Sequence, residues 1–180
     1  MSLFEHQYDI PEGLSDRLEL VFRRIMFVRR YTLLSLEGLN DEDWFWTPDT
    51  YTTHIAWQVG HIAISHYGLT LFRQRGRDLD VDSELMSGRF RKMFMKGTTP
   101  KPHSDEHPDP REIMEVLDRV LARTMVELPS FEGHLDEPVE APQAAFATKF
   151  GSLLFAPDHE MLHAGQIGML RRMMGKEPLR

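Results

Sequence analysis

Hydrophobic residues recur at three- and four-residue steps in four stretches of the chain, and this step places them on one face of an α-helix. In the first stretch Leu18, Val21 and Ile25 keep the step, while most of the arginines take other faces. The four predicted helices run from about Leu14 to Leu39, Thr53 to Arg75, Asp109 to Pro129 and Thr148 to Met174. We therefore expect one all-α domain over residues 1–180, folded as a four-helix bundle with long connectors.

Residues at the ends of these stretches indicate where the helices begin. Asp109 is the predicted N-cap of the third helix and Pro110 its first residue, because aspartate accepts a free backbone N–H and proline has none to leave unpaired. Thr52 or Thr53 is the predicted cap of the second helix. Pro157 interrupts the fourth pattern, and we expect one bent helix there and not two separate helices.

The connectors carry weaker patterns. Trp44, Phe45 and Trp46 lie in the turn-rich segment after the first helix. We expect these aromatic side chains to fold back as a hydrophobic plug over the bundle. Residues Ser83–Met95 are predicted to form one short helix, and Ser130–Ala147 is predicted to be an irregular connector.

Composition narrows the chemistry. The chain has nine histidines and no cysteine, so a metal site must use imidazole and carboxylate ligands. The net charge is −7 and no stretch is persistently basic, which argues against a nucleic-acid partner. The first ten residues are not typical of a signal peptide, and no apolar run approaches the ~20 residues that span a bilayer. We expect a soluble cytoplasmic protein.

The stretch from His159 to His163 reads His-Glu-x-x-His, the zinc-protease signature, on the last predicted helix. Two histidines four residues apart lie about one helical turn from each other, so both imidazoles can reach one ion. Such proteases take a third ligand downstream, but Met169 stands six residues past His163, where a histidine is expected. A third ligand must therefore come from upstream, which disfavours a conventional protease.

Three histidines on the second predicted helix compete for this role. His54 and His61 are seven residues apart on one stripe, roughly 10 Å apart along the axis, so we do not expect both to bind the same ion. His66 is turned about 140° from His61 and faces elsewhere. His61 lies in mid-helix, where an unpaired buried imidazole is costly, whereas exposure and helix-end interactions explain His54. We predict His61 as the ligand, with a satisfied core histidine as the alternative.

Two interpretations of Glu160 stay open. As the candidate catalytic residue it lies at the edge of the ligand face, near enough to hold a metal-bound water or to orient a ligand histidine. The alternative is a solvent-facing helix glutamate. For the remaining histidines a solvated position is sufficient explanation: His6, His103, His107 and His134.

With these residues in place, the chain resembles the DinB-like (DinB/YfiT) family of four-helix metal proteins. Three stretches carry the resemblance: Trp46-Thr47-Pro48, Ile55 to Ala63, and His159 to Ile167 followed by Leu170-Arg171-Arg172. The chain departs from the family pattern at Pro157, within the ligand helix, and at His54, where a small polar cap is usual.

The resemblance implies an open site in which His61, His159 and His163 bind a divalent metal ion, Zn²⁺ or Ni²⁺ among others, and a homodimer. It also implies a first functional hypothesis, a thiol-dependent S-transferase that uses a low-molecular-weight thiol as cosubstrate and acts on small-molecule electrophiles. Two alternatives remain: a metal-dependent hydrolase with Glu160 as general base, and a non-catalytic metal-bound module connected with stress.

Overall fold

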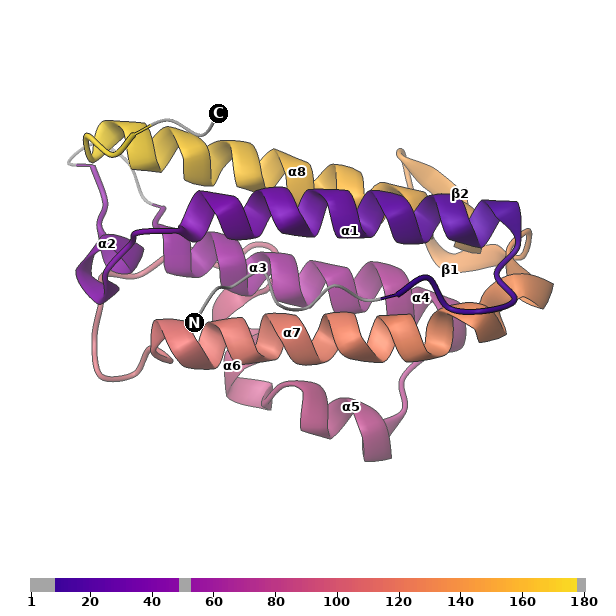
Figure 1. Ribbon diagram of the computed structural model, residues 1–180. Coiled ribbons are helices and arrows are strands. Elements are labelled where there is room, and N and C mark those ends of the chain that lie inside the picture. The colour runs from indigo at the N-terminus through magenta and orange to yellow at the C-terminus, as the bar shows by residue number, and fades with distance from the viewer. Residues whose placement is uncertain (1–8, 49–52, 178–180) are drawn as a thin grey trace.

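The four predicted helices are present in the computed structural model, which describes residues 9–48 and 53–177. They are α1 (Asp16–Leu36), α3 (Ile55–Tyr67), α7 (Pro110–Glu127) and α8 (Lys149–Met173). Figure 1 shows them running side by side along one direction. α3 packs against both α7 and α8, and α1 packs along α8. The all-α bundle is confirmed.

One of the two predicted helix caps is found. The Asp109 carboxylate accepts the backbone N–H of Glu112 at 2.7 Å, and Pro110 is the first residue of α7. The second helix differs, because its N-cap is His54, whose Nδ1 accepts the N–H of Trp57 at 3.1 Å. The prediction of Thr53 as the cap is therefore wrong, and Thr52 lies outside the described residues.

The second helix continues beyond α3 through a π-helical turn, η1 (Gly68–Phe72), into α4 (Arg73–Arg75). The predicted extent to Arg75 is thus confirmed, although the hydrogen-bond step changes on the way. In the last helix, Pro157 lies inside α8 without dividing it, as predicted. Both helices therefore continue without a break past the residues that they contribute to the candidate site.

The first connector folds onto the bundle as predicted. It contains a short helix, α2 (Asp41–Phe45), which Asn40 caps. Trp44 and Phe45 are buried in the main hydrophobic core, and Trp46 packs against that core while half-buried. Burial of these aromatic side chains holds α2 against the bundle.

The second connector forms two short helices where one was predicted. They are α5 (Leu79–Leu85) and α6 (Gly88–Phe94). Ser87 separates them because its side chain caps α6 by accepting the N–H of Phe90. α6 packs against α3, whereas α5 packs against α7. The last residue of α6 is therefore close to the middle of α3.

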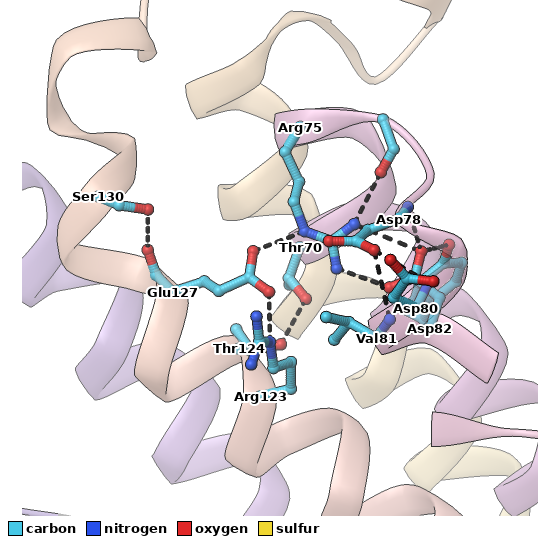
Figure 2. A network of polar contacts seen from close by, with 12 residues as sticks. Thr70, Arg75, Asp78, Asp80, Val81, Asp82, Arg123, Thr124, Glu127 and Ser130 are labelled. Atoms are coloured by element: carbon cyan, nitrogen blue, oxygen red, sulfur yellow. Dashed lines mark hydrogen bonds and ion pairs between the residues drawn. The ribbon is translucent and has the colours of Figure 1, made fainter. Parts of the chain in front are cut away.

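An ion-pair network attaches α5 to the bundle. Figure 2 shows Arg75 between the carboxylates of Glu127 and Asp82. Its Nε lies 2.6 Å from Glu127 and its Nη2 lies 2.6 Å from Asp82. One guanidinium thus joins α4, α5 and α7.

The third connector is more regular than predicted. It contains a 3₁₀-helix, η2 (Leu128–His134), and an antiparallel hairpin of β1 (Pro138–Gln143) and β2 (Phe146–Thr148). The irregular connector expected here is therefore wrong. Two prolines within β1 conceal it in the sequence, because proline normally counts against a strand. None of the helices in the described part of the chain is long and apolar enough to cross a bilayer.

Candidate metal centre

Three histidines from two neighbouring helices meet at one point of the bundle. His61 comes from α3, and His159 and His163 come from α8. The ring centres are 4.9 Å apart for His61 and His163, 5.4 Å for His61 and His159, and 4.6 Å for His159 and His163. One nitrogen from each ring lies within 4.8 Å of the other two. Two Zn–N bonds reach about 4 Å end to end, so small ring rotations suffice for one shared ion.

Two of the rings are held by acceptors on their far side. Nδ1 of His61 donates to the backbone carbonyl of Phe94 at 2.8 Å. Nδ1 of His163 donates to the side-chain carbonyl of Gln58, whose amide in turn donates to Thr53 at 2.8 Å. Both acceptors require a proton on Nδ1, which leaves each Nε2 unprotonated with a lone pair; that of His61 accepts from the Ser65 hydroxyl at 3.2 Å, a bond that a bound metal ion would replace. This is the tautomer that a metal ligand needs, and such partners typically orient ligand histidines.

All three imidazoles are neutral at pH 7. Burial, together with the charge of a neighbouring imidazole, lowers the pKa of His159 to about 4 and that of His163 to about 3. Burial also lowers the pKa of His61. His61 is buried, whereas His159 and His163 are half-buried, so the cluster opens to solvent on the α8 side. Neutral, convergent imidazoles with an open side fit a divalent ion that keeps room for a further ligand.

Three neighbours of the cluster were not singled out from the sequence. Trp57 stacks on His61 with ring centres 4.8 Å apart and planes within 5°. Gln58 holds His163, and the Ser65 hydroxyl lies 3.2 Å from Nε2 of His61. Helical spacing could have indicated Gln58 and Ser65 from the sequence. Gln58 precedes His61 by three residues and Ser65 follows it by four, which places both on the same helix face as His61.

A pocket of about 1140 Å³ lies next to the cluster. Trp57 and Phe94 line it, and these are the residues that stack on His61 and accept its Nδ1–H. The rest of the wall comes from α6 and from the loop that follows it, including Arg89, Met93 and Lys101. His61, His159 and His163 are not among the lining residues, so a ligand in this pocket meets the cluster through Trp57 and Phe94.

Glu160 takes a position that neither sequence interpretation describes. Its side chain is buried, which corrects the solvent-facing alternative. Arg29 of α1 donates from Nε to one carboxylate oxygen at 2.8 Å and from Nη2 to the other at 3.1 Å. Burial favours the protonated acid, but the Arg29 guanidinium outweighs it and holds the pKa of Glu160 below its ordinary value. Both oxygens are thus directed to Arg29, which disfavours a role on a metal-bound water.

His66 belongs to this buried pair and not to the metal cluster. Its Nδ1 lies 3.9 Å from Glu160, and its Nε2 is buried without a hydrogen-bond partner among the described residues. Burial, with the nearby charge of Arg29, lowers the pKa of His66 to about 3. The prediction that His66 faces away from His61 is therefore confirmed.

The other histidines lie outside the cluster. His54 caps α3 and is 1% exposed, so its helix-end role is confirmed and its expected exposure is wrong. His103 stacks on Phe45 at 4.1 Å and His107 lies edge-on to the same ring at 5.5 Å. His134 is exposed and contacts Glu137, as a solvated residue would. His6 lies outside the described residues.

Comparison with known proteins agrees with this arrangement. The sequence profile of the DinB superfamily matches residues 24–167, a span that includes all three clustered histidines. The chain therefore belongs to the DinB superfamily. No curated protein matches it with significance.

Proposed function

We propose that this chain is a metal-dependent enzyme in which His61, His159 and His163 hold a divalent ion and a low-molecular-weight thiol is the attacking group. The observation that carries the metal site is the orientation of His61 and His163 by carbonyl acceptors, which turns two lone pairs toward one point. A core histidine also needs an acceptor for its N–H, but a single core histidine does not account for three imidazoles whose nitrogens converge within 4.8 Å of one another.

The thiol part of the proposal comes from the resemblance to the DinB-like family, and the donor set and the composition are compatible with it. A divalent ion held by neutral imidazoles supplies a positive charge that favours thiolate over thiol, and thiolate is the nucleophilic form. The chain has no cysteine, so the sulfur must come from a small molecule. In the proposed reaction a sulfur–carbon bond forms, the bond from carbon to its leaving group breaks with its electron pair, and the thiol proton is released.

The pocket has the size for such a reaction. Pockets for drug-sized ligands commonly measure about 300–1000 Å³, and the cavity beside the histidines is about 1140 Å³. It therefore has room for a peptide-sized thiol together with a small electrophile. Trp57 provides a flat apolar surface on the side nearest to His61.

Metal content is the first test. Protein purified without a nickel column should contain about one equivalent of metal, because three imidazoles are the usual protein share of an open zinc site. His163→Ala should reduce this to below about a tenth of an equivalent, since two remaining imidazoles bind far more weakly. His134→Ala is the matched control, because it removes an exposed histidine outside the cluster. Little metal in the wild-type protein, with uptake unaffected by His163→Ala, would reject the site.

A thiol panel is the second test. With chlorodinitrobenzene as the electrophile, the metal-loaded protein should accelerate consumption of at least one thiol above the rate of the metal-stripped protein. The His163→Ala variant should return to the metal-stripped rate. Metal binding without acceleration by any thiol would support the non-catalytic module instead. Hydrolysis with Glu160 as base has less support, because Arg29 bonds both of its oxygens.

We also propose that the chain forms a homodimer. Two bundle helices carry exposed apolar side chains seven and eleven residues apart, a spacing that forms one stripe along each helix. The residues are Leu20, Phe27 and Tyr31 on α1, and Leu162, Met169 and Met173 on α8. Light scattering should give twice the chain mass of 21.0 kDa. Phe27→Glu should shift the mass toward the monomer, whereas Val126→Glu, at an exposed apolar position on α7, should not.

A further inference from the structure

We propose that the pocket beside the three histidines binds the acidic group of its small-molecule ligand, with Arg89, Lys92 and Lys101 as the counter-charges. Anion binding here does not depend on the metal. Only the further assignment of this ligand as the thiol cosubstrate rests on the proposed function.

The charge of the pocket is opposite to that of the chain. The whole chain has a net charge of −7. The pocket wall nevertheless carries three cationic side chains and only one carboxylate, that of Glu106. Within residues 9–48 and 53–177, no ion pair joins Arg89, Lys92 or Lys101 to a carboxylate. Arg89 donates to the backbone carbonyl of Glu106, not to its carboxylate.

These cations differ from three arginines elsewhere in the chain. Arg17 and Arg29 each donate through two nitrogens to one carboxylate. Arg75 donates to two carboxylates, those of Glu127 and Asp82. A cluster of unneutralised cations in a concave wall concentrates positive potential, because the low-dielectric protein focuses the field into the cavity. The electrostatic attraction on a bound anion is therefore stronger in this pocket than at a flat surface.

The pocket also offers an apolar surface for the rest of the ligand. Trp57 is fixed by a hydrogen bond from its indole N–H to the Thr98 hydroxyl at 3.1 Å. Met93, Pro100 and Pro102 add apolar wall around it. A ligand with its acidic group on the cations and its apolar part along Trp57 reaches the ring that stacks on His61.

The cation-bearing loop is held in place before any ligand binds. The Thr98 hydroxyl lies 3.0 Å from the carbonyl of Met93 and 2.8 Å from that of Met95, and its one proton can be donated to either. Nε2 of His54 donates to the carbonyl of Lys101 at 3.0 Å. Because these bonds fix the loop to α3 and α6, less ordering entropy is lost on binding. The pocket wall is therefore already ordered for binding a ligand, which a freely solvated loop would not be.

Calorimetry on metal-stripped protein tests the proposal with S-(2,4-dinitrophenyl)glutathione and its diethyl ester as probes. The two share their apolar parts and differ in two carboxylates. We expect the acid to bind about tenfold or more tightly than the ester at low salt, and the gap to narrow at high salt as the charges are screened. Benzoate and phenyl phosphate, used as competitors, then show whether carboxylate or phosphate is the preferred acidic group.

Matched charge reversals locate the effect. Lys92→Glu should weaken binding of the acid about tenfold while leaving the ester within about twofold. Arg30→Glu makes the same charge change at an exposed α1 position that is not in the pocket wall, and should change neither. Equal affinity for acid and ester, undetectable binding of the acid at millimolar concentration, or equal losses in both variants would overturn the proposal. Because the protein is metal-free, none of these results depends on the metal site.

Discussion

Two polar clusters of opposite character share the same pair of helices. α3 contributes His61 to one cluster and His66 to the other, and α8 contributes His159 and His163 to the first and Glu160 to the second. The cluster of Glu160 is closed, because Arg29 and Glu160 are both 2% exposed and bond each other twice. The three-histidine cluster is partly open and has no charge at pH 7.

The difference shows how adjacent residues divide their roles. A buried carboxylate needs a fixed cation, since an unpaired charge in the interior costs several kcal/mol. Neutral imidazoles need only one acceptor each, and they keep a lone pair for a ligand. The closed cluster therefore fixes the position of α1 against α8, while the open cluster next to it remains able to bind.

The largest expected effect comes from breaking the closed cluster. Glu160→Gln leaves Arg29 buried without a counter-charge, which should lower the free energy of unfolding by about 3–5 kcal/mol. Urea denaturation measures this loss. Metal content of the folded fraction should stay near that of the wild-type protein, because the three histidines are unchanged.

A double variant separates charge from packing. Arg29→Met with Glu160→Met removes both charges and should recover most of the lost stability, since apolar residues of similar volume often replace a buried ion pair without loss. If Glu160→Gln folds as stably as the wild-type protein but abolishes turnover, the proposed division of roles is wrong and Glu160 acts in the open cluster.

A smaller effect is expected from loosening the open cluster. Gln58→Leu removes the acceptor that orients His163, and loss of such a partner typically costs about 10–100-fold in metal affinity. Competition with a chromophoric chelator measures the change. Gln74→Leu is a suitable control, because Gln74 is also buried on this helix but bonds the carbonyls of Leu69 and Lys149. Equal metal affinities in the two variants would contradict the orienting role of Gln58.

The smallest effect concerns pH and the helix that serves both clusters. Burial, opposed in part by its bond to Lys101 and assisted by His103 and His107, lowers the pKa of His54 from 6.5 to about 4. The unfolded chain therefore binds the extra proton first, and stability falls as the pH drops from about 6.5 toward 4. His54→Asn keeps a capping oxygen without a titrating group, so it should reduce the loss between pH 7.5 and pH 5 by about 1–2 kcal/mol.

Denaturation curves of His54→Asn at several pH values, beside His134→Asn as an exposed control, measure this difference. Parallel pH profiles for the His54→Asn variant and the wild-type protein would exclude His54 as the source.

The fold was largely predictable because apolar periodicity extends over whole helices. The stripe through Leu18, Val21 and Ile25 is buried as expected. The hairpin was not predictable, because β1 is only six residues long and contains two prolines. One capping serine, Ser87, separates α5 from α6. A single serine is too weak a sequence pattern to predict a helix boundary.

The site was predictable only where the helix repeat carries the information. Spacing placed His159 and His163 together, and position within the helix separated His61 from His54. The partner of Glu160 is Arg29, which is 131 residues away, so no local pattern indicates it. The acceptor for His61 is a backbone carbonyl, that of Phe94, and a backbone group has no residue type to recognise.

The bond from His61 to the carbonyl of Phe94 has a consequence for the dynamics of the connector. Phe94 ends α6, and its ring lies so close to Gly60 that an added Cβ would meet it at 2.5 Å. Any ligand that fixes the ring of His61 also fixes this end of α6, and so raises the free energy of its local opening. Amide hydrogen exchange in residues 88–95 should therefore slow when metal is added, which makes a surface helix a reporter of occupancy in the bundle.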